Sequence, residues 1–363
     1  MKKGIDKLYL TSVILLTGLG FTAFFSASFG LLVKDDALAN SVLFNQTLGL
    51  LLGIIAFFVA SKINYLFYRK HALIIFAICL CINILLFFPV LTLHHGGASR
   101  WLDFRYFTIQ PSEILKIGFI IYLAGWLAVV RGKIESFKLG IFPFLCILGI
   151  ISILLLAQSD TDTLAVIGIT GVTMLFVAGG KVRHIALIGL MAVVFLACIV
   201  MVRPYARQRI MTYFSPNNDP QGAGYQIQQS LIAIGSGGIS GRGFGQSIQK
   251  FSYLPEPVGD SVFAVVAEEF GFIGTIILLC LYIFFLQRTF KIAARSPDMF
   301  SRLVVVGIGI LVVVQSFMNI SAMLGLIPLT GQTLLFVSHG GTALAIILGA
   351  AGIIANISRY QQK

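Results

Sequence analysis

Residues 184–202 have the sequence HIALIGLMAVVFLACIVMV, nineteen residues without an aspartate, glutamate, lysine or arginine. The hydrocarbon core of a bilayer is about 30 Å thick, and roughly 20 such residues are needed for one helix to cross it. We therefore expect a transmembrane helix here. The same length criterion locates the transmembrane segments in the rest of the chain.

The composition of the whole chain indicates a membrane protein and excludes a soluble enzyme. Of the 363 residues, 58% are hydrophobic and only 11% are charged, and the mean hydropathy is +0.95. A soluble domain carries about 25% charged residues because its surface must face water. Disorder is excluded because it needs low hydrophobicity and high charge. A β-barrel is excluded because its short alternating segments differ from the long apolar runs of this chain.

Ten stretches meet the length criterion, so the sequence predicts an all-α, polytopic integral membrane protein with about ten transmembrane helices. The predicted spans are residues 9–33, 40–60, 72–93, 111–130, 139–158, 161–179, 184–202, 261–287, 302–326 and 330–357. We predict one membrane domain over residues 1–363. In it, helices 1–7 (1–202) and helices 8–10 (261–363) flank a large extracytoplasmic loop at 203–260.

The distribution of charge predicts the orientation. Seventeen of the 26 lysines and arginines, but only three of the 14 acids, fall in the segments on the side of both termini. The positive-inside rule therefore places both termini in the cytoplasm. The other acids lie on or near the outer face, where we expect the chemistry. The net charge of +12 does not indicate nucleic-acid binding, because no basic domain stands outside the predicted spans.

Several acids are predicted to lie within or at the edge of the outer membrane half, where ionisable groups line a cavity, pair with one another or act on a substrate. They are Glu113, Asp160, Asp162, Glu268 and Glu269. Lys116 follows Glu113 by three residues on the same helix face, so an internal ion pair is the alternative to ligand binding. For Asp160 and Asp162 the alternative is capping of the following helix.

The predicted loop at 203–260 is too long for a simple connection. Residues 224–235 are amphipathic and predict a short interfacial helix. The glycine-rich run at 235–245 is interpreted as a flexible hinge. The alternative is a phosphate cradle, to which Arg242 and Lys250 would add positive charge.

The loop ends in YLPEPVGD, residues 253–260, where two prolines fix an extended approach to the next helix. Asp260 is thereby placed at the outer end of that helix. Its role is either to cap the helix N-terminus or to present a positioned carboxylate to a substrate.

Six motifs spread over the chain together resemble the SEDS family, the bacterial shape, elongation, division and sporulation proteins. The motifs are Gly97-Ala-Ser-Arg-Trp101, Gln110-Pro-Ser-Glu-Ile-Leu-Lys116, Gly241-Arg-Gly-Phe-Gly-Gln-Ser-Ile-Gln-Lys250, Tyr253-Leu-Pro-Glu256, Phe263-Ala-Val-Val-Ala-Glu-Glu269 and Phe336-Val-Ser-His-Gly-Gly341. Their versions are more similar to division-type than to elongation-type members.

The resemblance implies a peptidoglycan glycosyltransferase of the bacterial inner membrane. Such an enzyme polymerises lipid II, the undecaprenyl-diphosphate-linked disaccharide pentapeptide, on the outer leaflet during septal cell-wall synthesis. The implied partners are a class B penicillin-binding protein, which is a transpeptidase, and other divisome proteins. No nucleic acid is among them.

The resemblance makes Asp260 the catalytic residue, a general base that takes the proton of the attacking sugar hydroxyl in an inverting reaction. The expected substrate-binding residues are Arg100, Glu113, Lys116, Asp160, Lys250, Glu256 and Glu269. Cations would stabilise the leaving diphosphate, alone or with a divalent cation such as Mg²⁺ or Mn²⁺. No metal ligands are predicted, because carboxylates alone do not specify such a site.

The chain departs from the family pattern at three places. Val258-Gly259 stands where His-Thr is common, Asp162 replaces a glycine, and His339 replaces a tyrosine. Two other functions stay open: a flippase or transporter of lipid II, and a non-catalytic scaffold for the transpeptidase. Gly49 and Gly53 form a G-x-x-x-G pair that suits close helix contact, either with a partner or within the chain.

Overall fold

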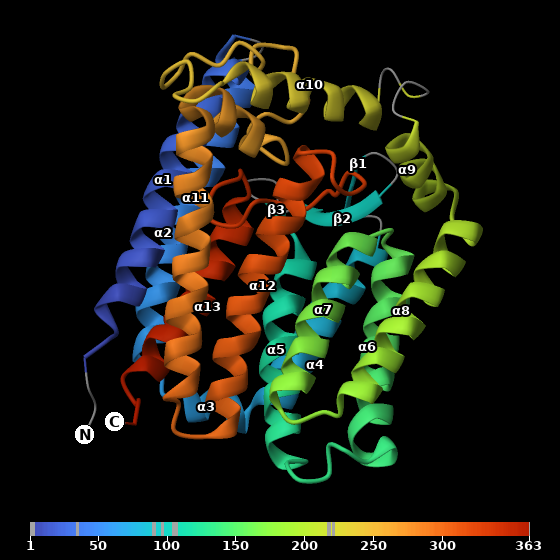
Figure 1. Cartoon of the computed structure of the whole chain (residues 1–363). Helices are drawn as coiled ribbons and strands as arrows, with labels where there is room; N and C mark the ends of the chain where they lie inside the picture. Colours follow the sequence, from blue (N-terminus) through green and yellow to red (C-terminus); the bar gives the residue numbers. More distant parts are fainter. Residues whose placement is uncertain are drawn as a thin grey trace.

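The structure is a computed structural model that describes residues 4–33, 36–88, 92–95, 98–103, 108–215, 219 and 222–362. It is a bundle of long helices, closed at one end by short helices, loops and a small sheet (Figure 1). Both termini lie at the other end of the bundle (Figure 1). We call these the loop end and the termini end.

Within the described residues, eight helices of the bundle are long and apolar enough to cross a membrane. They are α1 (Lys7–Leu32), α2 (Asp36–Lys62), α5 (Pro111–Val129), α6 (Phe142–Ala157), α8 (Val182–Val202), α11 (Val262–Ala294), α12 (Met299–Met323) and α13 (Gly341–Ser358). Two shorter apolar helices, α4 (Ala72–Ile84) and α7 (Thr161–Val177), complete the ten. The predicted all-helical, polytopic membrane fold is confirmed.

Short helical turns extend or join these elements. The 3₁₀ turn η1 (Leu85–Phe87) continues α4, and the π-helical turn η3 (Phe137–Ile141) leads into α6. The short helix α3 (Tyr65–Lys70) begins after Asn64, whose side chain accepts a hydrogen bond from the N–H of Leu66 (3.1 Å). Such a capping contact satisfies one of the free N–H groups at a helix start.

The predicted span at 72–93 is wrong in its last turns. After η1 the backbone of Phe88 is extended (φ −94°, ψ 111°), as expected for the residue before a proline, Pro89. The chain then forms a small antiparallel sheet, which the sequence did not predict. Its strands are β1 (Thr92–His95), β2 (Ala98–Asp103) and β3 (Thr108–Ile109), in the order β1-β2-β3.

The predicted span at 330–357 is confirmed as α13 except in its first residues, because the helix begins only at Gly341. Residues 324–340, which we call the crossing segment, are not helical. Gly325 and Phe336 have positive φ values of 67° and 71°, which an α-helix does not contain. An irregular backbone of this kind is tolerated in a membrane protein where other protein groups surround it.

The predicted loop at 203–260 contains two helices, α9 (Pro204–Phe214) and α10 (Ala223–Ser236). The helix α10 lies across the loop end, and α9 continues from α8 at the edge of that end (Figure 1). The helix predicted at 224–235 is therefore confirmed as α10.

The helix α11 is broken at Gly271, where the backbone is not helical (φ 65°, ψ −163°). Residues 272–294 still suffice to cross a bilayer, so residues 262–270 belong to the loop end. The glycine-rich run supplies backbone hydrogen bonds at the break. These are Arg242 N–H to Glu268 O (3.0 Å), Gly243 N–H to Glu269 O (3.0 Å), Phe272 N–H to Gly238 O (2.9 Å) and Ile273 N–H to Ile239 O (3.1 Å).

The glycines of this run allow two backbones to touch. A Cβ on Gly241 would lie 2.1 Å from the carbonyl oxygen of Glu269, and a Cβ on Gly271 would lie 2.3 Å from the nitrogen of Gly241. Such distances leave no room for a side chain. The run is therefore a packed element and not the free hinge we expected. Two of its N–H groups are already bound to α11, so they are not free for a phosphate.

The G-x-x-x-G pair of α2 packs within the chain. A Cβ on Gly49 would lie 2.3 Å from the Cα of Gly341, and a Cβ on Gly53 would lie 2.6 Å from the side chain of Leu348. Both partners belong to α13. The pair therefore brings α2 and α13 together, which is the intramolecular alternative.

Candidate functional site

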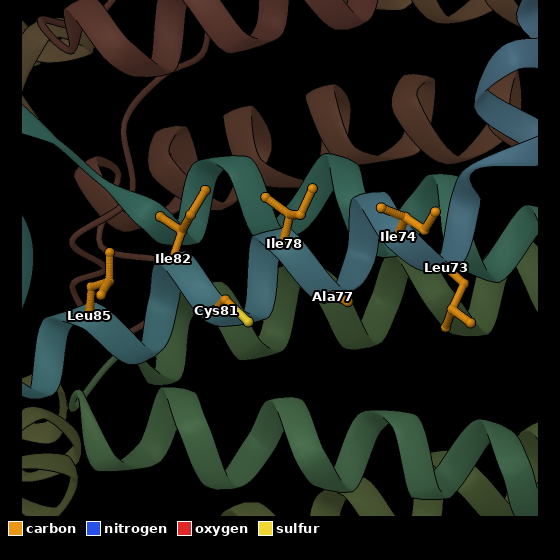
Figure 2. A pocket seen from close by; sticks show the side chains of 7 residues that line it. All are labelled: Leu73, Ile74, Ala77, Ile78, Cys81, Ile82 and Leu85. Carbon is orange, nitrogen blue, oxygen red and sulfur yellow. The ribbon is translucent and has the colours of Figure 1, made fainter.

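Among the described residues, an apolar groove and a cluster of charged residues are the candidates for a functional site. A groove on α4 is lined by apolar side chains alone, shown as sticks in Figure 2: Leu73, Ile74, Ala77, Ile78, Cys81, Ile82 and Leu85. A lining of this kind suits the acyl chains of a bilayer and provides no acid, base or hydrogen-bond donor for a reaction. The charged residues gather instead at the loop end.

The crossing segment connects the polar residues of the loop end. Its contacts are Gly331 N–H to Asp162 Oδ2 (3.1 Å), Gln332 Nε2 to Thr163 Oγ1 (3.1 Å) and Gln315 Nε2 to the carbonyl of Thr333 (3.2 Å). The partners come from α7 and α12. The non-helical crossing segment therefore joins the start of α7 to α12.

Asp260 lies two residues before α11, in a tight turn. The carbonyl of Glu256 accepts hydrogen bonds from the N–H groups of Gly259 (3.1 Å) and Ser261 (3.2 Å). Ser261 occupies the N-cap position of α11 without making a side-chain capping hydrogen bond, so Asp260 is not the N-cap of this helix. Among the described residues, no donor binds the carboxylate of Asp260, which is partly exposed. It is free to contact a substrate.

Four charged side chains act on Asp260. The partial burial of its carboxylate is the main reason that its pKa is raised, and the negative charges of Glu256 and Asp162 add to the effect. Arg209 and Arg100 act in the opposite direction, and the resulting pKa is about 7. A carboxylate with a pKa near the working pH is well suited to general base catalysis.

The start of α7 brings Asp160 and Arg100 together. Asp160 is the N-cap of α7, and its Oδ1 accepts a hydrogen bond from the N–H of Thr163 (3.3 Å). Its other oxygen, Oδ2, is buried without a partner among the described residues. Arg100, on β2, donates from Nη2 to the carbonyl of Ser159. Among the charged groups that raise the pKa of Arg100, Asp160 has the largest effect.

Asp162 binds Arg209 of α9. Arg209 Nη1 lies 2.7 Å and 2.9 Å from the two carboxylate oxygens. A second contact holds α9 in place, since the hydroxyl of Tyr213 donates to the carbonyl of Leu326 in the crossing segment (3.0 Å). The helix α9 is thus held at two points, once to the start of α7 and once to the crossing segment.

Glu113 and Lys116 form a buried ion pair in the first turns of α5. Lys116 Nζ lies 2.7 Å from Glu113 Oε1 and donates to Gln315 Oε1 at 2.6 Å. Gln315 in turn contacts Thr333 in the crossing segment. The structure therefore shows the internal ion pair that was the alternative to ligand binding for Glu113 and Lys116. Gln315 links this pair to the crossing segment.

Lys250 and Glu269 belong to a different cluster. Lys250 Nζ lies 2.7 Å from Glu269 Oε1 and donates to Ser26 Oγ of α1 (3.1 Å). Both charged side chains are buried, with exposures of 0% and 1%. Glu268 binds the same loop through Ser247 Oγ (2.6 Å). The cluster fastens the residues that follow the glycine-rich run, and α1, to α11, and no contact among the described residues joins it to Asp260.

The structure thus brings some of the predicted site residues together and separates others. Asp260 interacts electrostatically with Arg100 and Glu256, and Asp160 adjoins Arg100. The pair Glu113–Lys116 reaches the same crossing segment through Gln315. Lys250 and Glu269 lie in the separate cluster, and Gly97 of the first motif lies outside the described residues.

Sequence reasoning gave no site role to four residues that organise the site. They are Arg209, Gln315, Asn319 and Gln332. The sequence does contain a pattern that indicates two of them. Gln315 and Asn319 are polar and lie four residues apart, on one face of an apolar span. Polar groups inside a membrane line cavities or pair with one another. Among the described residues, no group of three or more His, Cys, Asp or Glu side chains is arranged to hold a metal ion.

The family follows from comparison with known proteins. A family profile for FtsW, RodA and SpoVE, described as a cell cycle protein, matches residues 6–363. The chain belongs to this family. The SEDS resemblance of its motifs is thereby confirmed.

Relatives within the SEDS family cover almost the whole chain. Stage V sporulation protein E of Bacillus subtilis (strain 168) is 37% identical over 363 residues, covering 99% of each chain. A protein named probable peptidoglycan glycosyltransferase FtsW, from Geobacter sp. (strain M18), is 35% identical over 98% of this chain and 97% of its own length.

Two solved SEDS-like structures have the same fold. A chain from a structure on the coordination of polymerization and crosslinking by a peptidoglycan synthase complex superposes with a TM-score of 0.81, at 26% identity over 99% of both chains. The rod shape determining protein RodA of Thermus thermophilus superposes with a TM-score of 0.71, at 25% identity over 99% of this chain and 98% of that one.

The three departures from the SEDS pattern all lie near the crossing segment. The carbonyl of Val258 accepts a hydrogen bond from the N–H of His339 (2.7 Å). The His339 ring stacks on Phe24 of α1, with 5.8 Å between ring centroids. Asp162 binds both Arg209 and Gly331, as described above.

Proposed function

We propose that this protein is a peptidoglycan glycosyltransferase that polymerises lipid II, with Asp260 as its general base. One observation carries the proposal. The Asp260 carboxylate is partly exposed and has no donor among the described residues, and the loss of water around it raises its pKa to about 7 although Arg209 and Arg100 act to lower it. The relatives named as probable peptidoglycan glycosyltransferases support it.

Each charged residue near the reacting atoms has a separate role in the reaction. The acceptor hydroxyl attacks the anomeric carbon of the donor sugar, and Asp260 takes the hydroxyl proton. The bond from that carbon to the diphosphate oxygen breaks, and its electron pair leaves with the diphosphate. Arg100 and Arg209 stabilise the developing negative charge. One base and no covalent intermediate suffice, so an α-linked donor gives a β-linked product.

A divalent cation is not needed for this account. Mg²⁺ is usually held by one or two carboxylates together with substrate phosphates. The described residues do not form a ready group of metal ligands, so we derive no step through Mg²⁺ or Mn²⁺.

We place the loop end on the outside of the bacterial cytoplasmic membrane and both termini in the cytoplasm. The basic residues of the termini side support this orientation through the positive-inside rule. Asp260 then meets lipid II in the outer leaflet. We also propose that residues 1–363 act as one membrane domain, since segments from both halves and the loop surround Asp260.

For partners, we propose a class B penicillin-binding protein and a role in the septal cell wall with other divisome proteins. The similarity to a chain of a peptidoglycan synthase complex supports the first part. The FtsW names of several relatives support the second, although the sporulation protein is similarly related. We propose that the other predicted site residues bind the substrate or shape its binding site. They are Glu113, Lys116, Asp160, Lys250, Glu256 and Glu269.

The test is glycan polymerisation from purified lipid II in detergent, with and without the class B penicillin-binding protein. We expect polymer from the wild type and none from Asp260→Ala, with equal thermal stability of the two proteins. No polymer from the wild type, even with the partner present, would refute the polymerase and favour the flippase or the scaffold.

A further inference from the structure

The carboxylate of Asp162 occupies a position built for an anion. Both of its oxygens are contacted by Arg209 Nη1 (2.7 and 2.9 Å), and Oδ2 also accepts the N–H of Gly331 (3.1 Å). A guanidinium group together with a backbone N–H is a common way to hold a phosphate oxygen. The carboxylate of Asp162 therefore stands where a phosphate oxygen would be bound.

A second guanidinium group reaches the same position. A Cβ built on Gly331 would lie 3.4 Å from Arg100 Nη1, 3.8 Å from Arg209 Nη2 and 3.8 Å from Asp162 Oδ2. The two arginines thus converge on a residue without a side chain. The Nε of Arg100 is buried and has no partner among the described residues, so this guanidinium group keeps an unused donor.

Asp162 is not needed to cap α7. That task is performed by Asp160, whose side chain accepts the N–H of Thr163. Asp162 is the second residue of α7, where a negative charge is favourable. Its carboxylate contacts Arg209 of α9 and the N–H of Gly331.

We propose that Asp162 is a built-in competitor for an anion site formed by Arg209, Arg100 and the N–H of Gly331. A phosphate group enters this site only when Asp162 releases Arg209. The inference deepens the proposed function and rests on it for one point: the phosphate is that of a lipid-linked diphosphate. Asp162 then weakens the binding of that group and sets the concentration of lipid substrate at which the protein works.

The experiment measures binding of inorganic pyrophosphate to the purified full-length protein in detergent by titration calorimetry. Asp162→Asn keeps the shape of the side chain and removes its charge, and we expect at least tenfold tighter binding than in the wild type. Adding Arg209→Gln to Asp162→Asn should abolish this gain. The matched control is Glu135→Gln, which removes a carboxylate from an exposed pair with Lys181 (2.6 Å) and should leave the affinity unchanged.

Equal affinity of the wild type and Asp162→Asn would overturn the proposal, as would a gain that persists without the Arg209 guanidinium. If Asp162→Asn does not fold, Asp162→Gly is measured against the same tenfold criterion. A second arm measures the KM for lipid II at pH 9, where Asp260 is ionised in both proteins. A lower KM for Asp162→Asn supports a lipid-linked diphosphate. A gain for pyrophosphate with an unchanged KM would refute the lipid-linked source.

The binding arm separates this inference from the proposed function. An inactive wild type whose Asp162→Asn variant still binds pyrophosphate more tightly would refute the polymerase and retain the anion site. An active wild type without such a gain would retain the polymerase and refute the built-in competitor.

Discussion

Asn319 of α12 donates a hydrogen bond from its side-chain amide to the main-chain carbonyl of Asp260, at 2.8 Å. The same amide group donates to the carbonyl of Gln332 in the crossing segment, also at 2.8 Å. Asn319 is fully buried. One rigid side chain of the bundle thus fixes the turn that carries Asp260 relative to the crossing segment.

We expect Asn319→Leu to lower the rate of polymerisation by about 10- to 100-fold, since a displacement of about 1 Å at a reacting group has effects of this size. Leucine has a similar volume but donates no hydrogen bond, so two buried carbonyls lose their partner. The measurement is kcat with purified lipid II. Asn64→Ala, which removes a helix cap at the termini end, is the control and should keep wild-type kcat. A wild-type kcat for Asn319→Leu would show that Asn319 does not position Asp260.

The pH dependence of activity should follow the ionisation of Asp260. A general base must be deprotonated, so we expect the rate to rise with pH through the Asp260 pKa of about 7. The negative charge of Glu256 disfavours ionisation of Asp260 and raises this pKa. Glu256→Gln should therefore move the rise in rate to lower pH, which a pH profile of kcat/KM measures. An unchanged profile would contradict the electrostatic coupling of these two acids.

The Lys250–Glu269 pair should behave as a buried ion pair. Removing one partner leaves an uncompensated buried charge, which costs about 3–5 kcal/mol, so Lys250→Met should strongly lower the temperature of unfolding in detergent. The double variant Lys250→Met with Glu269→Leu should be more stable than either single variant. Lys181→Met, in the exposed pair with Glu135, serves as the control and should change little. Additive losses in the double variant would argue against the pairing.

Alanine substitutions of glycine test the contact between the glycine-rich run and α11. Gly241→Ala should reduce the yield of folded protein, because its φ is 79° and its Cβ would lie 2.1 Å from a backbone oxygen of α11. Gly149→Ala in α6 is the control, since nothing lies within 4 Å of its Cβ. Alanine there should be neutral or stabilise the helix by about 0.5–1 kcal/mol. Equal yields for both variants would mean that the run does not pack as described.

The transmembrane helices could be predicted from the sequence because length and hydropathy report directly on crossing a bilayer. The stretch at 184–202 became α8 (Val182–Val202) almost without change. The crossing segment could not be found in this way, since its sequence is apolar, like that of a transmembrane helix. Its break depends on positive φ values at Gly325 and Phe336, which hydropathy does not detect.

The candidate site could be predicted only in part. The acids near the outer face included Asp160, and the family resemblance indicated Asp260; both interact electrostatically with Arg100 in the structure. The position of Lys250 could not be derived from its closeness in sequence to Asp260. The break of α11 at Gly271 turns the glycine-rich run back onto the helix, and Lys250 pairs there with Glu269.

The most direct test of Asp260 as the base is the polymerisation rate of Asp260→Asn, measured together with its binding of lipid II on the same sample. Asparagine keeps the size of the side chain but cannot take a proton from the acceptor hydroxyl. We predict a loss in rate of at least about 100-fold, with affinity for lipid II close to that of the wild type. A variant that polymerises lipid II at the wild-type rate would contradict the account.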